Sequence, residues 1–146
     1  MKIAIATDHN GVNEKKEIIN KLVGYEVIDM STDNNPTDDY PDFAFKVGEA
    51  VRDHLVDYGV LLCGTGIGMS IAANKVKGVR AAHISNIDEA HLAHEHNNAN
   101  VITMSYKNNV EDIVSWIKEF LETEFSNEER HIRRVDKINK YEEDNN

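Results

Sequence analysis

The sequence is poor in cysteine and in long apolar runs, and each scarcity excludes a class of protein. A single cysteine, Cys63, excludes an internal disulfide framework and is typical of a protein from a reducing compartment. No apolar run approaches the ~20 residues that a membrane-spanning helix needs, and no secretion signal is recognisable in the first residues. We therefore expect a cytoplasmic protein with no membrane partner.

Basic residues are also few. The chain has 16 Lys and Arg against 26 Asp and Glu, which gives a formal net charge of −10 at pH 7. Nucleic-acid backbones are bound by clustered positive charge, so we expect no nucleic-acid partner. An anionic ligand must instead meet a local basic site, and the one obvious cluster is "RHIRR" at Arg130–Arg134.

Short apolar runs alternate with amphipathic segments along the 146 residues, a length that suits one domain, 1–146. The apolar runs predict buried strands at Lys2–Ala6, Tyr25–Met30, Gly59–Cys63, Val79–Ile84 and Asn100–Met104. Helical spacing predicts helices at Glu14–Val23, Phe43–Leu55, Met69–Val76 and Val110–Phe125. The alternation predicts an α/β fold, a three-layer α/β/α sandwich with a Rossmann-like five-stranded parallel sheet.

The C-terminal part is charged and carries a narrow apolar stripe. Ile132, Val135 and Ile138 have helical spacing, which predicts a helical arm over about 126–141 that docks on another surface. We expect residues 142–146 to form a frayed end.

The stretch "CGTGIGMS" at 63–70 follows the third predicted strand, and open α/β sheets bind ligands beyond the carboxyl ends of their strands. Gly64, Gly66 and Gly68 alternate strictly, which fits neither a dinucleotide fingerprint nor a P-loop, so a nucleotide-sensing module is the weaker hypothesis. The N–H groups of such a turn can hold a developing oxyanion, and Cys63 beside them can act as a general base. The alternative is that Cys63 only ends a buried strand as a small apolar residue.

The histidines of "HLAHEH" raise a metal hypothesis. His91 and His94 are three residues apart on a predicted helix and could supply two ligands, but His96 falls off that face. We expect His91 and His94 to be solvent-facing helix residues, and we expect no bound metal.

Five motifs, taken together and in order, are similar to those of one known family. They are Asp8-His9, "DYPD" at 39–42, "CGTGIGMSIAANK" at 63–75, "HNNANV" at 96–101 and "RHIRRV" at 130–135. From Lys2 to about Ile138 the chain resembles ribose-5-phosphate isomerase type B, in the family shared with galactose-6-phosphate and allose-6-phosphate isomerases. The resemblance implies an aldose–ketose isomerase that acts on a small sugar phosphate without cofactor or metal. It also implies a homodimer, or a tetramer, whose active sites are shared between subunits.

The same resemblance implies the catalytic roles. Cys63 would move a proton between C1 and C2 of the sugar, since Met69 stands where other members carry a catalytic Glu. Thr65 would contact the reacting oxygens, and His96 would donate the proton that opens the sugar ring. The implied substrate-binding residues, with Tyr40 lining the site, are Asp8, His9, Gly64, Thr65, Gly66, Ile67, Gly68, Ser70, Asn97, Arg130 and Arg134.

In this resemblance the phosphate would be bound by His9 with Arg130 and Arg134, while Asp8 binds sugar hydroxyls. Arg130 and Arg134 are four residues apart and therefore share one helix face, whereas Arg133 points elsewhere.

The residues present also bear on the sugar. One subunit type of the galactose-6-phosphate relatives lacks the His-Asn pair that this chain keeps as His96-Asn97. The presence of His96, Arg130 and Arg134 together favours interconversion of ribose 5-phosphate and ribulose 5-phosphate through a cis-enediol, with allose or galactose 6-phosphate as the alternative. Lys107 stands where several members carry an Arg near the substrate, and a lysine lacks the bidentate fork of arginine.

Overall fold

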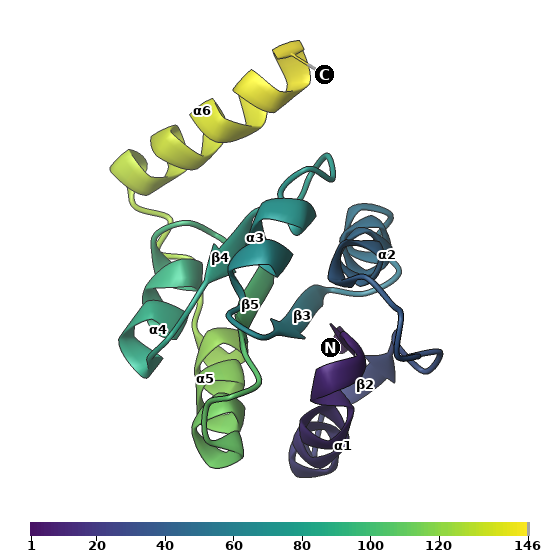
Figure 1. Ribbon diagram of the computed structural model, residues 1–146. Coiled ribbons are helices and arrows are strands. Elements are labelled where there is room, and N and C mark those ends of the chain that lie inside the picture. The colour runs from purple at the N-terminus through teal and green to yellow at the C-terminus, as the bar shows by residue number, and fades with distance from the viewer. Residues whose placement is uncertain (146) are drawn as a thin grey trace.

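The computed structural model describes residues 1–145 and has a five-stranded parallel sheet between two layers of helices (Figure 1). Its elements are, in chain order, β1 (Lys2–Thr7), a 3₁₀ turn η1 (His9–Gly11), α1 (Val12–Lys21), β2 (Glu26–Asp29), α2 (Tyr40–Arg52), β3 (Tyr58–Cys63), α3 (Ile67–Ala73), β4 (Ala81–His83), α4 (Ile87–Glu95), β5 (Val101–Ser105), α5 (Val110–Glu122) and α6 (Glu129–Asn145). The sheet order is β2-β1-β3-β5-β4. The predicted fold is therefore confirmed.

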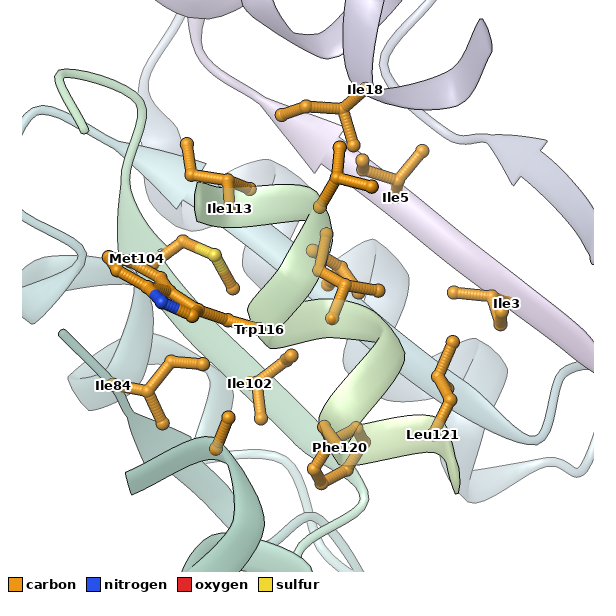
Figure 2. Packing of buried hydrophobic residues seen from close by; sticks show 14 of the residues in the cluster. Ile3, Ile5, Ile18, Ile84, Ile102, Met104, Ile113, Trp116, Phe120 and Leu121 are labelled. Carbon is orange, nitrogen blue, oxygen red and sulfur yellow. The ribbon is translucent and has the colours of Figure 1, made fainter. Parts of the chain in front are cut away.

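Successive residues of each strand face opposite helical layers. On β1, Ile3 and Ile5 pack with α1, α4 and α5, while Ala4 and Ala6 pack with α2 and α3. Figure 2 shows the first of these faces, where Trp116 of α5 lies among the strand side chains. Burial on both faces explains why the strands have nearly continuous apolar sequences.

The direction of winding reverses between the neighbouring strands β1 and β3. From β1 the chain passes through α1 to β2 at one edge of the sheet, and from β3 it passes through α3 to β4 at the other edge. Helices α1 and α3 pack on opposite faces. The loops after β1 and β3 therefore lie side by side at the carboxyl edge, where such sheets bind their ligands.

Strand β4 is shorter than the expected range Val79–Ile84. The backbone N–H of Arg80 donates to Asn100 Oδ1, and that of Ala81 donates to Asn74 Oδ1, both at 2.8 Å. The Asn100 side chain thus takes the hydrogen bond that Arg80 would give to β5 in a longer strand, whereas the Asn74 side chain binds an N–H that β4 turns to the open edge of the sheet.

Helix α6 lies beyond the three layers (Figure 1). His131 and Val135 are its buried residues. The helix continues through the end that was expected to fray, because Glu142 Oε2 accepts a hydrogen bond from Gly78 N at 2.8 Å. Asn146 lies outside the described residues. Across residues 1–145, no helix combines the length and the apolar character that crossing a membrane requires.

Candidate active site

Cys63 ends β3, and its sulfur lies against the turn that follows. The residue is 5% exposed and belongs to the apolar cluster under α2 and α3, together with the fully buried Met69. The N–H of Gly66 donates a hydrogen bond to Cys63 Sγ at 3.1 Å. A charged acceptor strengthens such a bond, so the turn supplies a donor that suits a thiolate.

The turn needs glycine at two of its positions. Gly66 has φ +81°, and a Cβ atom there would lie 2.6 Å from the Cα of Met104. A Cβ atom on Gly68 would lie 2.5 Å from Cζ of Tyr40, so the aromatic ring packs directly on this glycine. The close contact brings Tyr40, at the start of α2, to the turn.

The carbonyl groups of the turn are bound by strand β5. Ser105 Oγ donates to Gly64 O at 2.7 Å, and Thr103 Oγ1 donates to Gly66 O at 2.8 Å. The C=O of one residue and the N–H of the next point in opposite directions. The N–H groups of Thr65 and Ile67 therefore point away from β5. Ile67 N donates to Thr65 Oγ1, and Thr65 N is placed to donate to an oxyanion.

The remaining predicted residues of the turn occupy its outer side. Thr65 is exposed, and its Oγ1 accepts a hydrogen bond from Ile67 N at 3.1 Å. Ile67 is exposed at the first position of α3, and Ser70 is half-buried one turn later. The structure thus gathers Thr65, Ile67 and Ser70 around the start of α3 beside Cys63.

Asp8 and His9 follow β1 and lie at the same edge of the sheet. Strand β1 pairs with β3 in the register Thr7–Leu62, which places the residue after Thr7 beside Cys63. The Asp8 carboxylate accepts a hydrogen bond from Asn10 N at 3.0 Å and caps the short turn that contains His9.

His9 is held by Asp38, a residue that the sequence did not single out. His9 Nδ1 lies 2.6 Å from Asp38 Oδ1, and His9 N donates to the same oxygen at 3.0 Å. Burial opposes ionisation of Asp38, but hydrogen bonds from Asn34, His9 and Asn35 outweigh it and lower the pKa to about 2. The hydrogen bond with Asp38 raises the pKa of His9 above 6.5, against burial, and the charges of Asp38 and Asp8 add to the rise. The pair therefore favours a charged imidazole, which suits an anionic ligand.

The direction of each pKa shift defines the pH range in which this pair stabilises the fold. The contribution of Asp38 is present above its ordinary pKa of 3.8 and is lost as the pH falls toward 2. The contribution of His9 is fully present below 6.5 and is lost as the pH rises through its raised pKa. Both residues therefore make their full contribution to stability between pH 3.8 and pH 6.5.

The resemblance implies that His9 binds phosphate, and on that basis we expect the substitution Asp38→Asn to move the pH at which phosphate binding weakens. Without the Asp38 carboxylate, His9 loses the hydrogen bond and the charge that raise its pKa, so it becomes neutral at a lower pH. The measurement is the Kd of inorganic phosphate by calorimetry between about pH 5 and 9, the range in which a histidine titrates. The control is Asp33→Asn, which removes the same charge from an exposed position in the same loop. Equal midpoints for Asp38→Asn and the native chain would contradict the assignment.

Tyr106 is a second residue at this edge that the sequence did not mark as a site residue. A Cβ atom on Gly64 would lie 3.8 Å from the Tyr106 hydroxyl, so the phenol reaches over the turn. Burial raises the pKa of Tyr106, and the charges of Asp8 and Cys63 add to this rise. The hydroxyl is therefore a neutral donor. The sequence could have indicated Tyr106 by its position, because it directly follows a strand; the exposed Lys107 is the next residue.

The other predicted residues lie at the opposite edge of the sheet. His96 and Asn97 follow α4, which returns the chain to the amino ends of the strands, and Asn100 O then accepts a hydrogen bond from Gly59 N at 3.0 Å. Gly59 precedes Cys63 by four residues of β3, or about 13 Å at ~3.3 Å per residue. One chain therefore does not bring His96 and Asn97 to its own thiol.

Helix α6 brings the arginine cluster to this second edge. The ring of His131 packs on the ring of His96 with centroids 4.3 Å apart. Arg130 and Arg134 flank this contact on α6 and are both exposed, and Arg130 Nε donates to Glu128 Oε2 at 3.1 Å. Burial lowers the pKa of His131, and the positive charges of His96 and Arg130 add to the effect, so His131 favours its neutral form. His96, Asn97 and the two arginines thus form a second group, away from Cys63.

A pocket of about 550 Å³ also lies on this side, between α6 and the segment that leads into β4. Its lining includes Asn97 and Arg80 from the body and Ile138 and Tyr141 from α6. Cys63 is not among its lining residues.

His94 contradicts the expectation of a solvent-facing residue. It is 6% exposed, and its Nδ1 lies 3.0 Å from Phe120 O while its Nε2 lies 3.3 Å from the Tyr58 hydroxyl. The reason is that this face of α4 packs against α5 and the start of β3, where Phe120 and Tyr58 are the partners of the two ring nitrogens. His91 is half-buried, and its hydrogen bond with Glu95 raises its pKa. Residues 1–145 hold no group of three or more His, Cys, Asp or Glu side chains placed to bind a metal.

Nearly the whole chain is similar in sequence and structure to known proteins. Residues 3–138 match the ribose/galactose isomerase family. A putative sugar phosphate isomerase of Bacillus subtilis is 47% identical over 150 residues, covering 99% of each chain. The structure of ribose-5-phosphate isomerase B from Clostridium thermocellum is 44% identical, covers 100% of both chains and superimposes with a TM-score of 0.93. The structure of the Mycoplasma genitalium enzyme with bound ribulose-5-phosphate is 41% identical, covers 97% of this chain and 96% of that chain, and gives a TM-score of 0.90.

Proposed function

This chain belongs to the ribose/galactose isomerase family, and we propose that it interconverts ribose 5-phosphate and ribulose 5-phosphate, a step of the pentose phosphate pathway. The observation that carries the proposal is the sulfur of Cys63 on the glycine turn, hydrogen-bonded by Gly66 N at 3.1 Å. A base and a set of oxyanion donors side by side are what an enediol reaction requires. The free thiol also suits the cytoplasm, where thiols stay reduced.

The reaction follows from this arrangement. The Cys63 thiolate takes the proton from C2 of the open-chain aldose, and the electron pair of that C–H bond forms the C1–C2 double bond as the C1 carbonyl oxygen becomes an enediolate. The N–H groups of the turn stabilise the negative oxygen, and Thr65 contacts the reacting oxygens. A proton passes from O2 to O1, the C2 carbonyl forms, and the Cys63 thiol returns its proton to C1. No electrons enter or leave, so the step needs no redox cofactor.

The site is completed by a second copy of the chain. Cys63, Asp8 and His9 lie at the carboxyl edge of the sheet, whereas His96, Asn97 and the arginines of α6 lie at the amino edge. Apolar side chains are exposed on the two helices next to these groups, with Ile71 of α3 61% exposed and Tyr141 of α6 71% exposed. We infer a homodimer in which the amino-edge group of one subunit faces the thiol of the other. There His96 opens the sugar ring, and Arg130 and Arg134 bind the phosphate with His9.

An isomerase assay tests this function directly. We expect the purified protein to interconvert ribose 5-phosphate and ribulose 5-phosphate in the presence of EDTA, because no step uses a metal. Parallel measurements of kcat/KM with allose 6-phosphate and galactose 6-phosphate test the sugar, and ribose 5-phosphate should give the highest value. A higher kcat/KM for either hexose phosphate would move the assignment to that sugar, and no turnover of any of the three would contradict the function.

A further inference from the structure

Lys15 of α1 is a charged residue buried in the body of the protein. It is 2% exposed, and its ammonium lies 3.0 Å from Asp29 Oδ1. Lys15 Nζ also donates to the carbonyl oxygen and to Oγ of Ser31, both at 3.0 Å, and to Asn34 Oδ1 at 3.5 Å. A buried ammonium is tolerated only when its donors are paired in this way.

The partners of this ammonium lead directly to the loop that carries His9. Ser31 Oγ accepts a hydrogen bond from Thr7 N at 3.1 Å, and Asn34 Nδ2 donates to Thr7 O at 2.9 Å. Asn34 Nδ2 also donates to Asp38 Oδ2 at 2.9 Å. Ser31 and Asn34 therefore hold the end of β1 on one side and Asp38 on the other.

Lys15 anchors the oxygen side of the Asn34 amide. Asn34 Nδ2 faces two acceptors, Thr7 O and Asp38 Oδ2, so Oδ1 faces the ammonium, which has donors only. The same ammonium holds Ser31 through its carbonyl oxygen and its Oγ. Without Lys15, Ser31 and Asn34 lose the charged donor that fixes their positions, so Asn34 holds Asp38 less firmly and Asp38 positions His9 less firmly.

We propose that Lys15 is a positioning residue for phosphate binding, which acts through Asn34 and Asp38 on His9. The inference rests on the proposed function in that His9 binds the phosphate of the substrate. Lys15 contacts residues 29, 31 and 34 through this network and acts at a distance from the thiol of Cys63. Its loss should therefore weaken binding of the phosphate and leave the proton transfer nearly unchanged.

The test is the substitution Lys15→Met, which keeps the apolar stem and removes the charge. We expect the KM for ribose 5-phosphate and the Kd of inorganic phosphate each to rise about tenfold, as when a hydrogen bond to a charged group is lost, with kcat within about twofold. The control is Lys21→Met on the same helix, whose ammonium pairs with Glu111 at 2.9 Å on the outside of the protein. This control should leave KM, kcat and the phosphate Kd unchanged.

A merely structural Lys15 would give a different result. Lys15→Met would then lower the free energy of unfolding while the folded fraction kept the native KM and phosphate Kd, and that outcome would overturn the proposal. Asn34→Ala breaks the next link and leaves the Lys15–Asp29 pair in place, so it carries the same test if Lys15→Met fails to fold. We expect Asn34→Ala to weaken phosphate binding equally, and the double variant to be no worse than either single one. The calorimetric Kd of inorganic phosphate needs no turnover, so it tests Lys15 even if the native protein isomerises no pentose phosphate.

Discussion

Replacement of Cys63 by alanine is expected to lower kcat for ribose 5-phosphate by about 10³-fold, the magnitude typical of a lost general base. The thiolate is the only group that we assign to the C2 proton, and Met69, where the resemblance implies a catalytic Glu in some members, is fully buried in the apolar cluster. The KM should change little, because His9 and the arginines of the second subunit still bind the phosphate. The fold should also persist, since alanine fits where the buried sulfur lies.

The measurement that isolates the chemical step is the fate of deuterium placed at C2 of ribose 5-phosphate, followed by NMR. The native protein should remove the deuterium from C2, and Cys63→Ala should leave it there. Cys63→Ser is the matched variant, because its hydroxyl can still accept the hydrogen bond from Gly66 N but is a far weaker base at neutral pH. Removal of the C2 deuterium by Cys63→Ala at the native rate would contradict the assignment of the base, whereas retention of the deuterium with both variants supports it.

The features that could be predicted from the sequence are those that depend on local pattern. The apolar runs of the strands predicted a parallel sheet because strands buried on both faces need apolar residues at every position. The topology then placed Asp8, Cys63 and Tyr106 at one edge, because Cys63 ends a strand, the other two directly follow one, and parallel strands end together. The glycines of the turn could be singled out because their spacing matches no nucleotide motif, and Gly66 with φ +81° accounts for one of them.

The features that could not be predicted depend on which of several similar residues becomes buried. Lys15 and Lys16 are adjacent and chemically identical, yet only Lys15 turns inward toward Asp29 and Ser31. Asp38 is one of several acidic residues in its loop, and its hydrogen bond to His9 crosses 29 positions of sequence. His94 was misassigned for the same reason, since its burial depends on how α4 meets α5. These contacts are set by tertiary packing, which a single sequence does not display.

The division of the site between two edges of the sheet leads to the second large prediction. The Cys63→Ala variant is a subunit without the base. The double variant Arg130→Ala/Arg134→Ala is a subunit without the two arginines that bind the phosphate, here called the arginine clamp. Each protein alone should have almost no activity at low substrate concentration. When the two are unfolded together and refolded, a mixed dimer contains one site with both defects and one site with neither. Random pairing makes about half of the dimers mixed, so roughly a quarter of the native activity should return.

The recovered activity distinguishes a shared site from a site within one chain. If Cys63 and the arginines of the same chain met in one site, every site in the mixture would carry one defect, and mixing would restore nothing. Arg133→Ala is the matched control, because Arg133 lies on the same helix but pairs with Glu129 at 2.6 Å and is not part of the clamp. On its own, Arg133→Ala should keep native activity. When it is mixed with Cys63→Ala, the activity should fall only in proportion to the sites that carry the Cys63→Ala defect. Recovery with the clamp variant therefore requires that the amino edge of one subunit completes the carboxyl edge of the other.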